Sequence, residues 1–253
     1  MKISISRTKW ISIAAVALML LLWKGLAVHF NSDFILPHPE DTLVRTLSLF
    51  GENQFLFVVA ATILRGILGF AFSLIFGVGL GIAAGLSNDF NAFLKPILVV
   101  LRSTPVIAII LLALIWLNAN SVPIFIAILT MFPFICTNTI DGIRSVDKQL
   151  VEMAQVYKIG KLRIVREVFV PAIMPFIISG ASSAMGIGWR AIIIGEVLSQ
   201  PRYGIGTVMH SAQTFLNVDA VIAWTIIAVL LSYIFERIIR LTEKRIVVWR
   251  AKQ

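Results

Sequence analysis

Few residues in this sequence are of the types that do covalent chemistry, and their spacing forms no catalytic site. The three histidines, His29, His38 and His210, have no partner at a spacing that would make one of them a general base. The run Gly180-Ala181-Ser182-Ser183 lacks the glycine expected after a serine nucleophile, and the single Cys136 allows neither an intramolecular disulfide nor a cysteine metal site. The sequence therefore predicts no catalytic residue and no metal site, and an enzyme is the disfavoured alternative.

The nearest match to a phosphate-binding loop also fails. Such a loop needs a glycine, four further residues, and then Gly-Lys followed by Ser or Thr, because its backbone amides cradle the phosphates. Gly160-Lys161 is the nearest fragment, but Leu162 follows it and Gln155 occupies the upstream glycine position. The chain is therefore not expected to hydrolyse ATP, and no cofactor is predicted for it.

Three ionisable residues lie inside long apolar blocks, where a charge usually faces a bundle interior or a watery cavity. Arg190 follows Trp189 in a stretch rich in Gly and Ser, so it either meets an anion or braces a gate, or it pairs with a carboxylate or backbone carbonyls for structure alone. Glu196 lies near the predicted outer end of the same block, where water could solvate it. Arg65 is expected to brace neighbouring helices.

The elements that position these residues are predicted to be membrane-spanning helices. Of the 253 residues, 58% are hydrophobic and only 14% are charged, which leaves too little polar surface for a soluble domain of this size. About 20 apolar residues span a bilayer as a helix. We therefore predict an all-α membrane protein with one domain over 1–253 and six spans, at about 10–29, 55–86, 93–117, 121–140, 171–198 and 218–239. The first block also fits a secretory signal peptide, but an uncleaved helix is favoured.

The distribution of basic residues predicts the orientation. Of the 22 Lys and Arg, 17 fall at the two ends of the chain or on the same side as the 141–170 segment, and the opposite loops hold only Arg45 and Arg202. By the positive-inside rule, both termini and that segment are cytoplasmic. The net charge of +9 forms no continuous stripe, so nucleic acid is not an expected partner. The 17 residues are Lys2, Arg7, Lys9, Lys95, Arg102, Arg144, Lys148, Lys158, Lys161, Arg163, Arg166, Arg237, Arg240, Lys244, Arg245, Arg250 and Lys252.

Small residues recur at helical spacing within the second block. Gly77, Gly81 and Gly85 are four residues apart and therefore share one helix face. In lipid, small residues let helices approach closely. Packing within the chain and packing against a second subunit are both open interpretations of this face.

The cytoplasmic segment 141–170 is too long to be a simple connection between two spans. Leu150, Val151, Ala154 and Tyr157 fall at helical spacing after a helix start at Asp147. We expect a turn at Gly160 and then a second, basic helix. Such a helix–turn–helix suits docking into a soluble partner, and the alternative is a loop lying on anionic lipid headgroups.

This segment resembles the EAA motif of permease subunits of ABC importers. The run Glu152-Met153-Ala154, then Gly160, then Val170-Pro171, is similar to the pattern of that family. Further motifs resemble the branch that serves nitrate, taurine and aliphatic sulfonates, and they follow in order along nearly the whole chain: Ile35-Leu36-Pro37-His38-Pro39, Leu101-Arg102-Ser103-Thr104-Pro105, Phe132-Pro133, Asn138-Thr139, Gly142 to Asp147, and Trp189 with Glu196 and Gly204-Ile205-Gly206. Met153 replaces the middle alanine, and the glycine of the family falls where this chain has Lys158.

The resemblance implies a type I ABC importer fold with a cytoplasmic coupling helix, and the 147–167 loop seats in a groove of a separate ATPase. By position, Glu152 makes polar contacts to the ATPase, Ala154 permits close approach, Gly160 makes the turn and Arg163 is a further docking contact. The implied partners are a cytoplasmic ABC ATPase dimer that uses the ATP, an extracytoplasmic solute-binding protein, a second permease subunit, and the lipid bilayer of a bacterial inner membrane. For the second subunit a homodimer is favoured, and a heterodimer is the alternative. The candidates for the translocation pathway or gate are Asn138, Trp189, Arg190 and Glu196. A stand-alone channel or secondary transporter is the alternative function.

Overall fold

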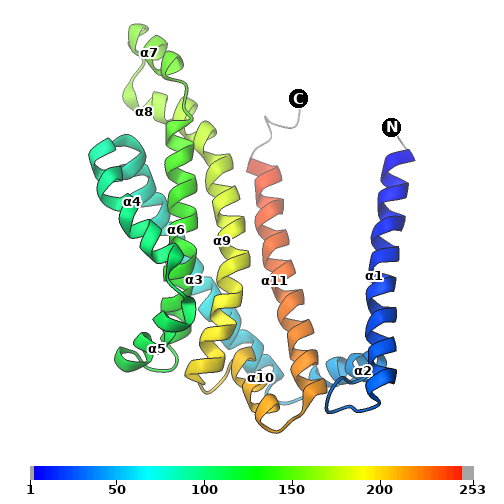
Figure 1. Ribbon diagram of the computed structural model, residues 1–253. Helices are drawn as coiled ribbons and strands as arrows, with labels where there is room; N and C mark the ends of the chain where they lie inside the picture. The colour runs from blue at the N-terminus through cyan, green and yellow to red at the C-terminus, as the bar shows by residue number, and fades with distance from the viewer. Residues whose placement is uncertain (1–2, 247–253) are drawn as a thin grey trace. The chain divides into compact units, whose positions relative to one another are not determined.

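The computed structural model describes residues 3–246, and within them the chain is helical with no strand. Figure 1 shows the elements in order: α1 (Ile3–Phe30), α2 (Pro39–Leu49), α3 (Phe55–Leu86), α4 (Asn88–Ser103), α5 (Val106–Trp116), α6 (Val122–Arg144), α7 (Lys148–Val156), α8 (Lys161–Ile164), the π-helix η1 (Val165–Phe169), α9 (Val170–Ser199), α10 (Ile205–Thr214) and α11 (Val218–Ile246). Lys2, Arg250 and Lys252 of the predicted cytoplasmic set lie outside the described residues. An all-helical membrane protein is confirmed.

Five described helices are long and apolar enough to cross a membrane, and a bent pair makes a sixth candidate span. The five are at Lys9–Phe30, Phe55–Leu86, Val122–Arg144, Lys161–Ser199 and Val218–Ile239. The fourth combines α8, η1 and α9 into one continuous helical run. Helix α10, in the segment between the last two spans, had no counterpart in the sequence-based expectation.

The third predicted block is not one straight helix. It divides into α4 and α5, whose axes differ by 97°. Thr104 is extended, with φ −71° and ψ 130°, because the following Pro105 disfavours a helical conformation for the residue before it. The span expected over 93–117 is therefore a bent pair of helices, and the proline is the physical reason for the bend.

The chain forms two compact units. One contains the residues up to Val58 together with Val208–Val229, and the other contains Val59–Thr207 together with the residues from Leu230 onward. In the first unit, the Trp23 indole donates a hydrogen bond to the Pro37 carbonyl at 3.1 Å. An ion pair joins Lys24 of α1 to Glu40 of α2, and the Lys24 ammonium lowers the pKa of the Glu40 carboxyl.

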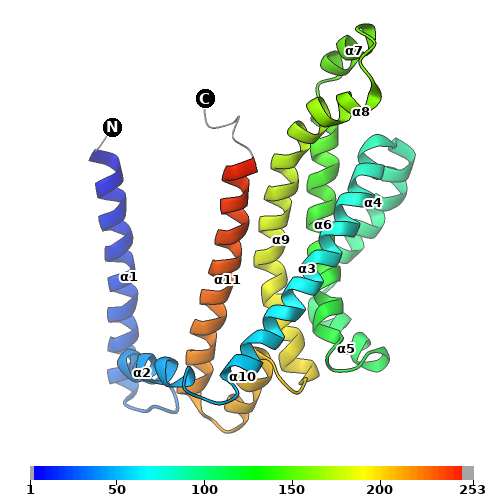
Figure 2. The ribbon, with the colours of Figure 1, turned by 180° about the vertical axis from the view of Figure 1, so that it is seen from behind.

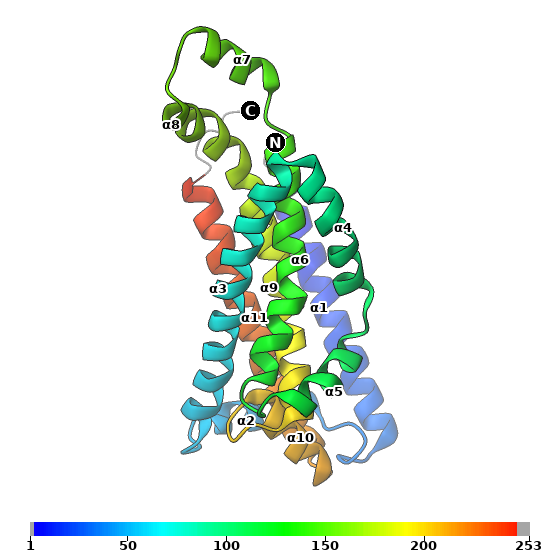
Figure 3. The same ribbon diagram turned by 90° about the vertical axis from the view of Figure 1, so that its left-hand side faces the viewer.

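In the second unit, α3, α6 and α9 run side by side (Figures 2 and 3), and small residues of α3 permit the close approach. A Cβ placed at Gly77 would lie 2.9 Å from Ile135, and one at Gly81 would lie 2.6 Å from Thr139. At Gly85 it would lie 2.5 Å from Ile143. The glycine face predicted from the sequence therefore packs within the chain, against α6, which excludes its availability to a second subunit.

Candidate functional site

The 147–167 loop stands at the end of α6 and α9 that lies away from α5 (Figures 1 and 2). Helix α7 begins where the sequence predicted, because the Asp147 carboxylate caps it by accepting a hydrogen bond from the Gln149 amide at 2.8 Å. Its end differs from the expectation. The left-handed residue is Lys158, with φ 54°, whereas Gly160 has φ −61° and precedes α8.

Two backbone hydrogen bonds identify this turn as a Schellman motif. The Ile159 amide donates to the Ala154 carbonyl at 3.0 Å, and the Lys158 amide donates to the Gln155 carbonyl at 2.9 Å. Glycine is the preferred residue at the left-handed position of this motif, since it has no Cβ to clash. Lys158 thus occupies the position where the glycine of the resembled family falls, and the turn expected at Gly160 is made two residues earlier.

The faces of α7 have different surroundings. Ala154 is buried at 4% exposure, whereas Tyr157 is 75% exposed and Leu162, in α8, is 83% exposed. Leu150, Met153 and Val156 are exposed as well. Large apolar side chains that are exposed on such a loop are suited to contact with a protein partner. We call Leu150, Met153, Val156, Tyr157 and Leu162 the apolar tip.

The polar residues predicted in this loop lie beside the apolar tip. Glu152 lines a cavity between α7 and the ends of α3 and α6, together with Arg144 and Lys148. Arg163 donates a hydrogen bond to Glu167 at 2.9 Å, and both side chains are exposed. A Cβ added at Gly160 would meet no atom within 4 Å, so steric crowding does not require a glycine at this position.

Glu196 lies inside the protein, with no exposed surface, and not at a solvated helix end. Its carboxylate accepts hydrogen bonds from the Arg65 guanidinium at 2.6 Å, the Thr62 hydroxyl at 2.9 Å and the Gly206 amide at 2.9 Å. Burial without such partners would be costly for a carboxylate. This placement gives Glu196 a bracing position and distinguishes it from the exposed Arg190.

Arg65 completes this buried network, as the sequence analysis expected of a bracing residue. It also donates hydrogen bonds to the Tyr203 carbonyl at 2.7 Å and to the Asn120 side chain at 3.0 Å. The network therefore joins α3, α9, the 117–121 turn and the 200–205 segment. Gly204 fits against it, since a Cβ there would lie 2.7 Å from the Glu196 carboxyl carbon.

The other pathway candidates divide between buried and exposed positions. Trp189 is 2% exposed, and its ring packs against Phe235 with 5.2 Å between centroids. Asn138 is partly buried and donates a hydrogen bond to the Phe134 carbonyl at 2.8 Å. Arg190 is exposed, and no described side chain forms an ion pair with it. The expected structural pairing of Arg190 with a carboxylate is therefore absent from the described part of the chain.

The exposed face of α9 differs in chemistry from the exposed face of α3. On α9 the residues Ser179, Ser183, Ile187 and Arg190 follow one another at helical spacing, and Ile187 and Arg190 are exposed. On α3 the exposed residues within the span are apolar, as expected for contact with lipid, and the large ones among them include Leu64, Ile67, Leu68, Phe72, Ile75 and Phe76. A face carrying hydroxyls and an arginine at membrane depth is suited to water or to a polar partner.

Arg102 lies at the break between α4 and α5, and the sequence analysis did not include it among the candidate site residues. The Arg102 guanidinium lies over the Phe134 ring of α6, 5.1 Å from its centroid. This distance is within the range of a cation–π interaction. Pro105, three residues further on, is the signal that could have placed Arg102 at a helix break.

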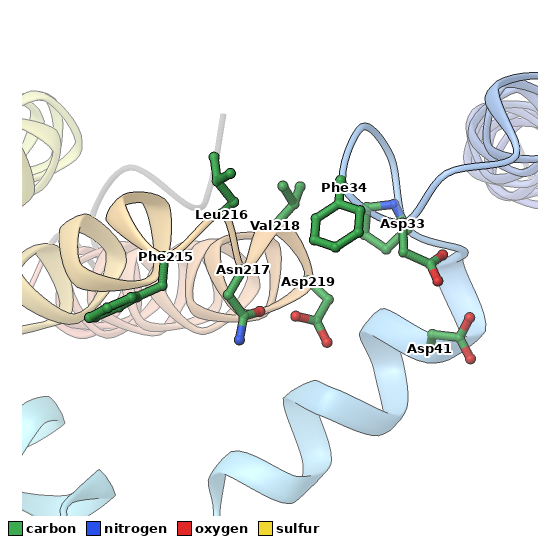
Figure 4. A pocket seen from close by; sticks show the side chains of 9 residues that line it. Asp33, Phe34, Asp41, Phe215, Leu216, Asn217, Val218 and Asp219 are labelled. Atoms are coloured by element: carbon green, nitrogen blue, oxygen red, sulfur yellow. The ribbon is translucent and has the colours of Figure 1, made fainter.

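A separate hollow of about 390 Å³ lies in the first unit, between the 31–38 segment and the start of α11. Figure 4 shows the carboxylates of Asp33, Asp41 and Asp219 around it, with the exposed rings of Phe34 and Phe215 nearby. The hollow belongs to the segments that precede α2 and α11 in the chain. It combines negative charge with exposed aromatic surface.

Comparison with known proteins points to transport. The family described as "Binding-protein-dependent transport system inner membrane component" matches residues 76–248. A taurine transport system permease protein, TauC, of Escherichia coli (strain K12) is 27% identical over 98% of this chain and 92% of its own length. A putative aliphatic sulfonates transport permease protein, SsuC, of the same organism is 32% identical over 88% of this chain and 85% of its own length. Among solved structures, an inward-facing conformation of the MetNI methionine ABC transporter matches with a TM-score of 0.55 at 19% identity, covering 75% of this chain and 91% of that chain. The family match includes the whole 147–167 loop and all of α9.

Proposed function

Because the chain belongs to the family of binding-protein-dependent transport system inner membrane components, it is the permease subunit of an ABC importer, and we propose that it carries a small anionic, sulfonate-like solute. Importers of this family work with an ATPase and a solute-binding protein. Membership excludes the alternative of a stand-alone channel. The nature of the solute is inferred from taurine and aliphatic sulfonates, which the names of two relatives specify.

The observation that carries the proposal for an anionic solute is the exposed Arg190, which has no ion-pair partner among the described residues. Helix α9 is 30 residues long, or about 45 Å, and Arg190 lies nine residues before its end, about 14 Å away. A cation at that depth is costly in lipid, so its face borders a watery pathway or a polar partner. A sulfonate passing that face would gain a charge-assisted hydrogen bond from the guanidinium. Trp189 and Asn138 support the face from behind, and Glu196 braces its outer end.

The 147–167 loop is proposed to couple this pathway to the ATPase. The apolar tip supplies the surface that inserts into a groove of the ATPase. A few anchor side chains, often Trp, Tyr or Arg, carry most of the binding energy of a protein interface, and the exposed Tyr157 is of this type. Glu152 and Arg163 would add polar contacts beside it, the buried Ala154 lets α7 lie close to its own support, and Gly160 opens the second helix. ATP is used by the partner ATPase dimer, and this chain needs no cofactor of its own. Tyr157→Asp is expected to release the ATPase during copurification while the permease remains in the membrane.

The proposed setting is a bacterial inner membrane with both termini in the cytoplasm. Two copies of the permease would enclose the pathway, so that the Arg190 face of each copy is covered without contact with lipid. On the outer side, the acidic hollow beside Phe34 and Phe215 is proposed to receive basic side chains of the solute-binding protein. Complementary charges of this kind mainly accelerate encounter and select the partner.

Uptake by the reconstituted transporter tests the role of Arg190. Permease, ATPase and binding protein are placed in proteoliposomes, and uptake of radiolabelled taurine and alkyl sulfonates is measured. Arg190→Gln should lower uptake at least tenfold while ATPase copurification stays normal. Arg202→Gln is the matched control, since Arg202 is also an exposed arginine but lies outside the spans, over the Tyr203 ring. Equal uptake by both variants would refute the anion contact, and failure of every sulfonate and taurine in the unmodified transporter would refute the solute class.

A further inference from the structure

The cavity lined by Glu152 also contains cationic and apolar side chains to which the proposed function assigns no role. It measures about 690 Å³ and lies between α7 and the ends of α3, α6 and η1. Arg144 and Lys148 supply two cationic side chains, and Leu86, Val151 and Phe169 supply apolar walls. A cavity with a cationic part and an apolar part fits an amphiphile with a negatively charged head.

The depth of the cavity places it where spans end. Leu86 is the last residue of α3 and Arg144 is the last residue of α6, and both helices are candidate spans. Phe169 belongs to the run Lys161–Ser199, a third candidate span. Two spans thus contribute their last turns to the cavity and the third contributes Phe169, about two turns from its start, which puts the opening near the level of lipid headgroups.

The two cations have little internal compensation. Arg144 makes one long hydrogen bond, from its guanidinium to the Asn88 side chain at 3.4 Å. Neither Arg144 nor Lys148 forms an ion pair with any described side chain. Basic pockets between transmembrane helices on the cytoplasmic side are known to suit anionic lipid headgroups.

We propose that this cavity binds an anionic phospholipid. The phosphate would lie between Arg144 and Lys148, and the glycerol and the first acyl carbons would lie along Leu86, Val151 and Phe169. Because α7 carries the apolar tip, a bound lipid would link the coupling loop to the membrane surface. This proposal concerns lipid alone and does not depend on the identity of the solute.

Glu152 allows a test in which two kinds of substitution should change the lipid affinity in opposite directions. It follows Lys148 by four residues on α7 and lines the same cavity, so its carboxylate opposes the binding of an anion. Removing either cation should weaken the binding of anionic lipid, whereas neutralising Glu152 should strengthen it. General loosening of the loop would change all three variants in the same direction.

The experiment uses the full-length permease purified in detergent and titrated with phosphatidylglycerol or phosphatidylcholine, with bound lipid counted by native mass spectrometry. Arg144→Gln and Lys148→Gln should each weaken phosphatidylglycerol binding about fivefold, the effect of about 1 kcal/mol per basic residue near a lipid surface. Glu152→Gln should strengthen it by a similar factor. Lys161→Gln is the matched control, because Lys161 is an exposed lysine of the same loop that does not line the cavity.

Three results would overturn the proposal. The first is equal phosphatidylglycerol binding by Arg144→Gln, Lys148→Gln and the Lys161→Gln control. The second is equal affinity for phosphatidylcholine, which would remove the charge preference. The third is displacement of the lipid by glycerol 3-phosphate at the same concentration, which would make a soluble phosphate the ligand. A size-exclusion profile like that of the unmodified chain shows that each variant is folded.

Discussion

Among substitutions of Glu by Gln in the described ion pairs, Glu196→Gln should destabilise the protein most. The substitution keeps the shape of the side chain but removes its charge, and an amide N–H then faces either the Arg65 guanidinium or the Gly206 amide. Glu196 has no exposed surface and the Arg65 side chain is 8% exposed, so water cannot compensate. Breaking one side of a buried pair costs about 3–5 kcal/mol. For a chain of this size, that corresponds to a fall in Tm of roughly 6–20 °C.

The measurement is thermal unfolding of the detergent-purified permease, followed by tryptophan fluorescence. Glu167→Gln is the matched control, because Glu167 pairs with Arg163 at 2.9 Å where the side chains are 57% and 69% exposed. An exposed pair contributes about 0–1 kcal/mol, so this control should change Tm by only a few degrees. The double variant Arg65→Met with Glu196→Leu should be less destabilised than the sum of the two single variants, since it leaves no unpaired charge. Equal Tm for Glu196→Gln and Glu167→Gln would refute the bracing role of the network.

Two further predictions compare glycine positions. Gly81→Ala should destabilise the chain by about 1–3 kcal/mol, because its Cβ would lie 2.6 Å from Thr139 and force α3 away from α6. Gly79→Ala on the same helix should keep or raise Tm, since no atom lies within 4 Å of a Cβ there; a lower Tm for Gly79→Ala than for Gly81→Ala would contradict the packing described. Lys158→Gly should relieve about 1 kcal/mol of left-handed strain and slow hydrogen exchange in α7, whereas Gly160→Ala should be tolerated. Loss of α7 protection in Gly160→Ala would instead assign the turn to Gly160.

Helix locations followed from the sequence wherever local signals decided them. Helix α3 has the bounds expected from its apolar block, and Asp147 caps α7 because its side chain reaches an amide two residues away. The break between α4 and α5 was missed because long apolar runs flank it on both sides, at 97–101 and 106–117. The residues Thr104-Pro105 carried the signal, since a proline restricts the residue before it.

Long-range contacts could not be inferred in the same way. Arg65 and Glu196 are 131 residues apart in the chain, and only the packed helices bring them together. Their types suggested that both lie at membrane depth, but no local pattern distinguishes a buried pair from two separate charges. The turn at Lys158 was assigned to Gly160 because glycine is the usual left-handed residue, whereas here the end of α7 at Val156 fixes the position of the turn.

The two arginines inside the spans differ in burial, which supports a structural role for Arg65 and the transport role proposed for Arg190. The Arg65 guanidinium donates hydrogen bonds to Glu196, to the Tyr203 carbonyl and to Asn120. Its charge is therefore compensated within the protein, and it is not positioned to bind a solute. Arg190 has the same guanidinium at membrane depth, but it is exposed and has no ion-pair partner among the described side chains. Because an uncompensated cation in lipid is costly, the membrane-embedded complex must supply what the single chain lacks. A transient anion beside water meets that need only during transport, which is the behaviour expected of a pathway residue.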